Sequence, residues 1–476
     1  MRKTSASRLF IALLVWTCFL ATGAATPKPK STPIPLSAQQ VRTATHRWTY
    51  DPALAQWKPV MLSYPLRRHT GVQRVQVSGR EFPLSTAAGW QVAPVVAWNS
   101  LQGEFLAVWE DFRNGSDRDI YAQRFNADGR LIGDNHAIVI GQYDQADPVL
   151  LNDKADGGYV LIWHHQQPGN DGIYWQHLST TGTPLGAPLR VPSPAGRQQW
   201  IPGGAFNDAH NEFLVVWEDL STSEILGQRI ANDNGEALGD PIIISDRPKL
   251  QWTPTFAAFS PVWDEYLVVW DDLLHGDLFG QIVTGDGRLR GENLAVSVAA
   301  GKQFASDLVY NGARDEYLAL WTDQRGSSAD DSNVYCQRVA GGGLLLGDEQ
   351  VVSGAPGPQL DCVGWYDRTH DEYMLLWWDG RDARTGNDIH GQRVSANGPL
   401  LGPDVAVSAN SSDQVYPALA YRETSDQYAV VWQEWRVVNE WDVEADVYAM
   451  LYSPLRFSLR FPWVTQGWLQ TGWDAD

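Results

Sequence analysis

Cysteine and basic residues are scarce in this chain of 476 residues. It holds three cysteines, and its 36 lysines and arginines are outnumbered by 56 aspartates and glutamates, for a formal net charge of −20. A surface of this sign repels nucleic acid and anionic lipid, so we expect no nucleic-acid partner; divalent cations, basic partners and neutral sugars suit it better. A chain of this size does not need disulfides to hold its core.

The few cysteines leave one possible pair. Cys18 lies in the N-terminal leader described below, so Cys336 and Cys362 remain, on predicted strands of neighbouring sequence repeats. The sequence is compatible with a disulfide between them and with two buried free thiols. Such scarcity fits a bacterial product better than a small, disulfide-rich animal scaffold.

Long apolar runs are missing after the N-terminus. Basic residues at positions 2 and 3 precede the apolar stretch Leu9–Leu20 and the small residues of Ala21–Ala25, a layout typical of a secretory signal peptide. Twelve residues are too few to span a bilayer comfortably. We therefore expect a signal peptide at 1–25, a stiff Pro/Ser/Thr-rich linker at 26–41, and a mature protein that is secreted, periplasmic or in the cell envelope without membrane insertion.

A repeat runs through the rest of the chain. An apolar run that ends in tryptophan, clearest as Glu316-Tyr-Leu-Ala-Leu-Trp321, occurs seven times, and successive closing tryptophans are 51 to 56 residues apart. A period of about fifty residues indicates one supersecondary unit repeated along the chain. The closing residues are Trp109, Trp163, Trp217, Trp270, Trp321, Trp377 and Trp432.

Each unit contains four short runs separated by turn signals, with no helical period. The first opens with a Gln-x-x-Pro pattern such as Gln91–Pro94, the second ends at the tryptophan, and the third has the form Asp-Ile-Tyr-x-Gln-Arg. The fourth follows a tight turn such as Asp286-Gly287, a strong hairpin signal. Four sequential antiparallel strands per unit predict an all-β fold, a β-propeller of four-stranded blades over residues 42–461.

The number of blades depends on the two ends of the repeat region. Tyr50–Met61 aligns without gaps on Tyr310–Trp321 as a degenerate eighth unit, and we expect Arg456–Phe461 to supply the last unit's fourth strand. Eight blades result if both ends form separate blades, which is our first expectation, and seven result if they share one closing blade. Residues 462–476 form a tryptophan-rich tail that is either a strap or a partner tag.

These units resemble those of bacterial secreted repeat proteins, which read roughly Glu-Tyr-Leu-Val-Val-Trp-x-Asp, then Asp-Ile-Tyr-Gly-Gln-Arg-Val, then Asp-Gly. The clearest copies are Asn211–Ile230 and Asp371–Val394, and the resemblance covers about residues 46–455. It implies a propeller outside the cytoplasm. It implies no reaction, because the motif carries no catalytic set and a fold alone does not define a function.

Strand direction predicts which loops share one face of the disc. The start of the first strand, the end of the second and the start of the third lie at one end of an antiparallel unit. We call this end the Gln face, since it collects the glutamines that open the units, which are Gln91, Gln145, Gln199, Gln251, Gln303, Gln359 and Gln414. These glutamines either bond neighbouring blades together or form a ring of donors and acceptors suited to sugar hydroxyls.

Candidate ligand contacts lie where units break their own pattern on this face. Aromatic residues stand beside three of the glutamines, a second tryptophan follows Trp377, and a histidine replaces an acid after Trp163. Exposed aromatics stack on sugar rings or anchor protein partners. The repeat tryptophans themselves are expected in the core between blades. The predicted ligand-binding set is Gln199, Trp200, Gln251, Trp252, Gln303, Phe304, Trp378 and His165.

The acidic hairpin after each tryptophan has two interpretations. An aspartate two residues after a strand-ending tryptophan commonly caps the hairpin by accepting backbone N–H groups. Asp111, Asp117 and Asp119 also offer several oxygens within one turn, as Ca²⁺ requires. Their spacing matches no EF-hand loop, and Arg113 and Arg118 already supply positive charge. We therefore expect no cofactor, with bound Ca²⁺ as the alternative. His164 and His165 are adjacent on a strand and should point to opposite faces, which disfavours a shared metal.

Catalytic motifs are missing as well. The chain has no Gly-x-Ser-x-Gly, no His-Glu-x-x-His and no sialidase-type Ser-x-Asp-x-Gly-x-Thr-Trp box, although two well-placed carboxylates suffice for a glycosidase. We therefore expect a monomeric, secreted binding or interaction module for an extracellular glycan or an envelope protein. A glycoside hydrolase or lyase that uses carboxylates of the same face is one alternative, and a structural envelope component is another.

Overall fold

The computed structural model describes residues 42–51, 56–65 and 79–454, except for 154–155, 168–170, 246–254, 273–274, 327–330, 383–384 and 440–441. For the first two ranges, and for residues 437–439 and 442, only the backbone is described. The predicted signal peptide, linker and C-terminal tail lie outside the described residues, as do Gln251 and Trp252. No helix among the described residues is long and apolar enough to cross a membrane.

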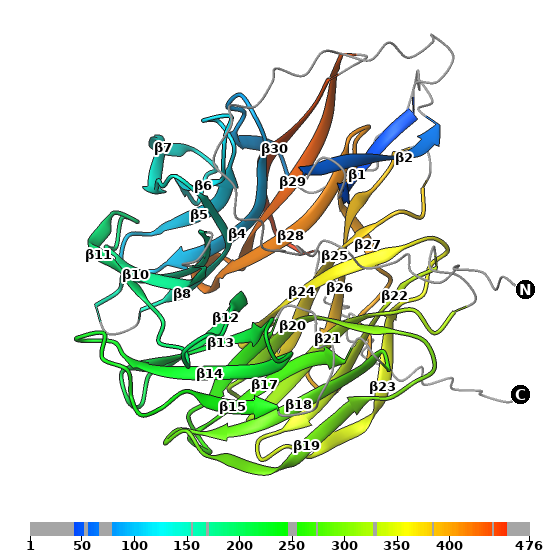
Figure 1. Cartoon of the computed structure of the whole chain (residues 1–476). Coiled ribbons are helices and arrows are strands. Elements are labelled where there is room, and N and C mark those ends of the chain that lie inside the picture. The colour runs from blue at the N-terminus through cyan, green and yellow to red at the C-terminus, as the bar shows by residue number, and fades with distance from the viewer. Residues whose placement is uncertain are drawn as a thin grey trace, which may run out of the picture.

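In the part of the chain described, seven four-stranded antiparallel sheets form a ring (Figure 1). The first strand of each sheet contacts the first strand of the next, which closes the ring around its axis. Blades 1 to 3 consist of β4 (Gln91–Asn99), β5 (Glu104–Asp111), β6 (Asp119–Asn126) and β7 (Leu131–Val139); β8 (Asp144–Asn152), β9 (Tyr159–Gln166), β10 (Gly172–Leu178) and β11 (Pro184–Arg190); and β12 (Gln199–Asn207), β13 (Glu212–Asp219), β14 (Glu224–Ala231) and β15 (Ile242–Ser245).

Blades 4 to 6 repeat this order. They consist of β16 (Phe256–Ser260), β17 (Glu265–Asp272), β18 (Asp277–Thr284) and β19 (Leu289–Ser297); β20 (Gln303–Asn311), β21 (Glu316–Asp323), β22 (Asn333–Ala340) and β23 (Leu345–Ser353); and β24 (Gln359–Asp367), β25 (Glu372–Asp379), β26 (Asp388–Ser395) and β27 (Val405–Ser408). The all-β propeller predicted from the repeat is confirmed.

Blade 7 is completed by a strand from the other end of the chain. β28 (Asp413–Arg422), the short 3₁₀ helix η1 (Glu423–Ser425), β29 (Gln427–Asn439) and β30 (Asp442–Tyr452) make up most of it, and β3 (Glu81–Ser85) pairs with β30 as the fourth strand. The two ends of the repeat region therefore share one closing blade, which gives seven blades, the alternative count. The expectation that Arg456–Phe461 supplies this strand is wrong, because β3 occupies the position. This backbone pairing joins the two ends of the repeat region within one blade.

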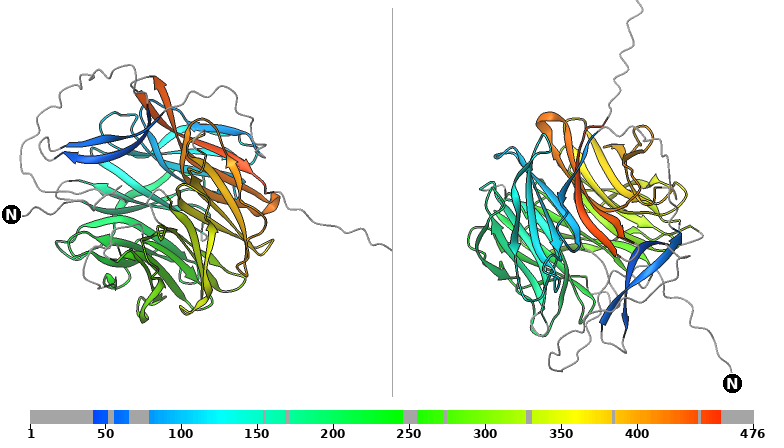
Figure 2. Two further views of the ribbon diagram at one scale, coloured as in Figure 1. Left: turned by 90° about the vertical axis from the view of Figure 1, so that its right-hand side faces the viewer. Right: turned by 90° about the horizontal axis from the view of Figure 1, so that it is seen from above.

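The degenerate eighth unit forms a separate hairpin. β1 (Arg42–Asp51) and β2 (Gln56–Pro65) make a two-stranded antiparallel sheet, drawn in blue in Figure 2. Tyr50 pairs with Trp57 in this hairpin as Tyr310 pairs with Tyr317 in blade 5. The gapless alignment thus predicted the register of a blade's first two strands, although the described residues show no third or fourth strand beside them.

The repeat tryptophans are buried between blades, as predicted. Trp109 shares an apolar cluster with Val431 and Val447 of blade 7, and Trp163 shares one with Val108 and Ile120 of blade 1. Each of these tryptophans therefore faces the preceding blade. Because burying so large a side chain is worth roughly 3 kcal/mol, seven of them make a substantial part of the adhesion between blades.

The two cysteines of the ring are free and buried. Cys336 on β22 and Cys362 on β24 belong to one apolar cluster between blades 5 and 6. Burial raises the pKa of the Cys336 thiol to about 12 and also raises the pKa of Cys362, where nearby Asp307 adds to the effect. Of the two possibilities left open by the sequence, the structure has the pair of buried thiols.

Candidate functional site

In the six blades where the opening glutamine is described, the inner strand bends shortly after it. β-Bulges interrupt the pairing of the first and second strands at this point, for example between Val92 and Val95 in β4. In five blades the residue two positions after the glutamine has a positive φ angle, and these residues are Ala93, Asp147, Ile201, Asp361 and Tyr416. A bulge re-aims a side chain, and a left-handed conformation in a residue other than glycine costs on the order of 1–3 kcal/mol. The fold thus holds a strained residue from several blades near the ring axis.

In three blades the side chain that follows the repeat tryptophan bridges to the bulge of the next blade. Glu110 Oε1 accepts the backbone N–H of Asp147 at 2.8 Å, and Asp271 Oδ1 accepts that of Ala305 at 3.3 Å. Gln433 Oε1 accepts the N–H of Ala93 at 3.3 Å, which links blade 7 to blade 1. Since successive side chains of a strand point to opposite faces, the tryptophan contacts the preceding blade and the next residue contacts the following one.

The glutamines that open the units are buried, with exposed fractions of 0 to 2% in the six blades where they are described. Gln199 Oε1 accepts the N–H of Ile173 in blade 2 at 3.1 Å, and its Nε2 donates to the carbonyl of Val191 at 3.2 Å. This glutamine therefore bonds blade 3 to blade 2, whereas Gln91 and Gln359 donate to carbonyls of the loops just before their own strands. Gln199 and Gln303, both in the predicted ligand-binding set, are buried away from solvent. Trp200 is buried too, with its ring 4.7 Å from that of His164.

The aspartates after the repeat tryptophans cap their hairpins. Asp111 accepts the N–H of Arg113 at 2.9 Å and the Nε1–H of Trp109 at 2.8 Å, and the Arg113 guanidinium donates to both of its oxygens. Blades 5 and 6 repeat this Trp-x-Asp-x-Arg arrangement. Asp117 and Asp119 share the side-chain amide of Asn114 instead. The three Ca²⁺ candidates therefore already meet internal donors, which does not favour a shared ion.

Partly exposed aromatic residues gather on the Gln face at blades 6, 7 and 1. They are Trp378, Tyr416, Trp435, Trp90 and Phe112. The Trp90 ring lies 5.8 Å from Phe112 and 5.6 Å from Trp435, both edge to face. β29 and β30, 13 and 11 residues long against 8 for β5 and β6, reach past the neighbouring blades at this point (Figure 1). Of these five residues, only Trp378 belongs to the predicted set.

Trp378, Asp361 and Tyr416 lie together at blades 6 and 7, and we call these three residues the axial aromatic site. Trp378 Nε1 donates to Asp361 Oδ2 at 2.6 Å. Burial raises the pKa of the Asp361 carboxyl, while the hydrogen bond from Trp378 opposes the rise. Burial also raises the pKa of the Tyr416 hydroxyl, and the charges of Asp361 and Glu110 add to it. The site therefore combines an indole, a phenol and a carboxyl group with a raised pKa.

The remaining predicted residues lie elsewhere on the same face. His165 is partly exposed in blade 2, with its ring 5.3 Å from Tyr174, whereas His164 is buried against Trp200 of blade 3. The two histidines thus point to opposite faces of their strand, as predicted. Burial lowers the pKa of His164, but hydrogen bonds to Asp147 and Asp171 outweigh it and raise the pKa. Phe304 is partly exposed at the start of β20 in blade 5.

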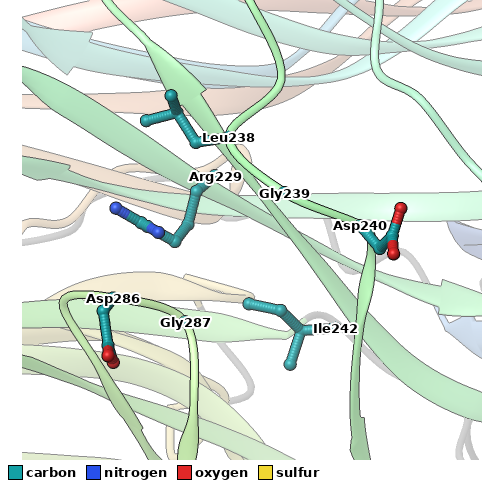
Figure 3. A pocket seen from close by; sticks show the side chains of 7 residues that line it. All are labelled: Arg229, Leu238, Gly239, Asp240, Ile242, Asp286 and Gly287. Carbon is teal, nitrogen blue, oxygen red and sulfur yellow. The ribbon is translucent and has the colours of Figure 1, made fainter.

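Two shallow grooves lie near the opposite end of the ring. One has a volume of about 370 Å³ between blades 3 and 4 and is lined by Arg229, Gly239, Asp240 and the Asp286-Gly287 turn (Figure 3). The other has about 390 Å³ between blades 5 and 6, and its lining residues Arg338, Gly347, Asp348 and Gly398 occupy the same repeat positions. Because the grooves recur with the repeat, they are features of the architecture and not one specific site.

A ring of seven four-stranded blades places this chain among the β-propeller proteins. A Dyadobacter fermentans protein of unknown function has a similar structure, with a TM-score of 0.50 and 11% identity over 79% of this chain and 98% of that one. An ulvan lyase of polysaccharide lyase family PL25 also has a TM-score of 0.50, with 11% identity over 77% of this chain and 95% of that one. No protein-family model and no curated protein matches the sequence. At these identities the likeness shows the fold alone.

Proposed function

We propose that this protein is a secreted binding module that recognises an extracellular glycan through the axial aromatic site. The observation that carries the proposal is the contact between Trp378 and Asp361, in which a partly exposed indole is held at 2.6 Å by a carboxylate beside the Tyr416 phenol. Aromatic faces stack on the apolar faces of sugar rings, and carboxylate and phenol oxygens bond to their hydroxyl groups. The axial aromatic site therefore presents aromatic rings and polar oxygens side by side, which is the combination that sugar binding requires.

Charge and position support the same class of ligand. A net charge of −20 favours neutral sugars over anionic polymers. Asp361 and Tyr416 lie on β24 and β28, the inner strands of blades 6 and 7, so a ligand that touches both would lie near the ring axis. One protein of similar fold is described as an ulvan lyase, which acts on a polysaccharide. A propeller of this kind is thus compatible with glycan recognition.

The test is a glycan array probed with the purified protein, with and without Ca²⁺, followed by titration of any glycan that binds. Trp378→Ala should weaken binding at least tenfold. Trp263→Ala is the matched control, since Trp263 is 50% exposed on a turn at the opposite end of the ring. Equal binding by both variants and the parent protein would remove the axial aromatic site from the function.

A glycoside hydrolase or lyase is the second candidate, and the raised pKa values of inner-strand carboxyl groups favour it. Burial raises the pKa of Asp307 to about 6, and it also raises the pKa of Asp361 in the next blade. A carboxyl group with a raised pKa keeps its proton to a higher pH than usual, which suits general acid catalysis. Release of reducing sugar that Asp361→Asn abolishes, while glycan binding remains, would establish an enzyme. A stable envelope-protein partner without glycan binding would instead support a purely protein-binding or structural role.

A further inference from the structure

Two aspartates and a histidine meet between blades 6 and 7, at the end of the ring opposite the Gln face. Asp367 is the last residue of β24, His370 lies in the turn before β25, and Asp426 lies between η1 and β29. One ligand atom from each of the three lies within 4.8 Å of the other two. The cluster thus joins the first hairpins of two neighbouring blades.

The separations of His370 Nδ1 from the two carboxylates lie within the reach of a single divalent ion, although the shorter one is a hydrogen bond that an ion would have to open. His370 Nδ1 is 2.7 Å from Asp367 Oδ2 and 3.9 Å from Asp426 Oδ1. Zn²⁺ binds nitrogen and oxygen at about 2.0–2.2 Å, so two of its ligand atoms can be no more than about 4.2 Å apart. The Asp367 side chain is fully buried, whereas those of His370 and Asp426 are 31% and 37% exposed. One side of the cluster is therefore open to water, which can complete the coordination.

Neighbouring groups hold the carboxylates in place. Asp367 Oδ1 accepts the backbone N–H groups of Thr369 at 2.9 Å and His370 at 3.2 Å, which turns Oδ2 toward the imidazole. The Tyr421 hydroxyl donates to Asp426 Oδ1 at 3.0 Å. Such supporting hydrogen bonds orient the ligands of metal sites and are a regular part of them.

A buried hydroxyl beside the cluster is a second, independent observation. The Tyr428 side chain is fully buried, and its hydroxyl has no hydrogen-bond partner within the described residues. At the boundary of blades 5 and 6 the equivalent tyrosine, Tyr373, receives a hydrogen bond of 3.0 Å from Asn311 Nδ2. Asp367 stands where Asn311 stands in the previous unit. This unit therefore has a carboxylate at the position where the previous unit has an amide donor. A buried hydroxyl without a partner costs free energy unless another group compensates.

Other blade boundaries make the same contact with fewer carboxylates. Arg314 Nε donates to Asp371 Oδ1 at 3.2 Å between blades 5 and 6, and His210 Nε2 is 3.0 Å from Asp264 Oδ1 between blades 3 and 4. The strand before those contacts ends in an asparagine, Asn311 or Asn207. Between blades 6 and 7 a second carboxylate is present, and one histidine faces two acids.

In a comparable cluster in blade 6, an arginine balances the negative charge of the carboxylates. Asp379, His390 and Asp404 also bring their ligand atoms close together, but the Arg381 guanidinium donates to both carboxylates. Between blades 6 and 7 the side chain next to both carboxylates is an imidazole, with His370 Nδ1 2.7 Å from Asp367 Oδ2 and 3.9 Å from Asp426 Oδ1.

We propose that Asp367, His370 and Asp426 bind a divalent transition-metal ion of the Zn²⁺ type, which ties blade 6 to blade 7. One imidazole with two carboxylates is a ligand set that suits Zn²⁺ and its neighbours better than Ca²⁺, which prefers oxygen alone. Blade 7 is also the blade that closes the ring through β3. An ion at this boundary would stabilise the ring where the two ends of the repeat region meet.

Zinc titration of the full chain, after treatment with a chelator, tests this site directly. Isothermal titration with ZnCl₂ should give one equivalent of tight binding, and the melting temperature should rise with Zn²⁺ but not with an equal concentration of Ca²⁺. Asp367→Asn should weaken Zn²⁺ binding at least tenfold. The metal-free variant should be at least as stable as the metal-free parent, because the introduced amide can donate to the Tyr428 hydroxyl as Asn311 does to Tyr373.

His210→Ala is the matched control, because it removes a histidine from an equivalent boundary that has one carboxylate fewer. It should leave Zn²⁺ binding unchanged, whereas His370→Gln should weaken it at least tenfold and serves as the second variant if Asp367→Asn folds poorly. The proposal is overturned if the parent binds no stoichiometric Zn²⁺, if Asp367→Asn and His370→Gln bind like the parent, or if His210→Ala loses as much affinity as His370→Gln.

Discussion

Glu110 on β5 of blade 1 holds the strained backbone of Asp147 in blade 2, because its carboxylate accepts the Asp147 N–H at 2.8 Å where the chain has a φ angle of 53°. The same carboxylate receives Arg118 Nη1 at 2.9 Å, and both side chains are nearly buried. The Glu110 carboxylate therefore pairs with the buried Arg118 guanidinium and also fixes the bulge at Asp147 near the ring axis.

Replacing Glu110 by alanine should lower the free energy of unfolding by about 3 kcal/mol, since it leaves a buried arginine short of a partner. Arg118 keeps contacts with Asp144 and Gln166, which limits the loss. Urea unfolding of the variant and the parent measures the effect. Glu110→Gln, which keeps the acceptor for the Asp147 N–H, should lose less; equal losses would show that the bulge contact contributes nothing.

The second prediction concerns β3, the strand that closes the ring. Leu84 of β3 is 2% exposed and shares an apolar cluster with Trp109 and Val447. Leu84→Ala should therefore cost about 2–5 kcal/mol, as for other buried leucines. Leu101→Ala is the control, because Leu101 is 70% exposed on a blade 1 turn and its loss should change little. A Leu84→Ala variant with the melting temperature of the control would argue against closure by β3.

The repeat made most of the fold predictable, but not its closure. Seven tryptophans at a nearly constant spacing indicated both the propeller and their own burial, because period and apolarity are local properties of the sequence. Glu81–Ser85 carries none of the repeat motif, and its pairing with β30 joins residues far apart in the chain. Such pairing depends on the closed ring, so the blade number could not be fixed from the pattern alone.

The position of the candidate site was predictable only in part, for a similar reason. Strand direction placed Trp378 on the correct face, but the glutamine pattern gave no sign of the bulge that follows it. Positive φ angles at Ala93 and Tyr416 do not show in a sequence, since neither residue is a glycine. One sequence pattern does indicate how the hairpin acids are paired. An arginine stands two positions after Asp111 and after Asp379, and in the structure it donates to that aspartate.

Asp307 predicts a pH dependence of stability. Burial raises its folded-state pKa to about 6 from an ordinary value of 3.8, although the N–H groups of Leu308 and Gly364 oppose the rise. A raised carboxyl pKa means that the folded protein holds the proton more tightly, so this contribution is full below about pH 4 and is lost as the pH rises through about 6.

Asp307→Asn should therefore remove this dependence. Relative to the parent, the variant should be more stable at pH 7.5 than at pH 4.5 by about 2 kcal/mol, measured by urea unfolding at both values. A difference between variant and parent that stays constant with pH would show that Asp307 titrates normally.

The thiols of Cys336 and Cys362 should be unreactive in the folded protein. Both are buried, and burial raises the pKa of each, so neither the thiolate nor access for a reagent is present. In a Cys18→Ser background, a thiol reagent should titrate no group under native conditions and two after unfolding without reductant. Fewer than two groups after unfolding would indicate a disulfide and contradict the structure.

Binding of a glycan by paired tryptophan variants tests the central claim most directly. Affinity for the best array ligand should fall at least tenfold in Trp378→Ala, because this variant lacks the indole that bonds to Asp361 and that we propose stacks on the sugar. It should remain at the parent value in Trp263→Ala, whose tryptophan is exposed at the other end of the ring. Unchanged affinity in Trp378→Ala, with both variants folded, would contradict glycan recognition at the axial aromatic site.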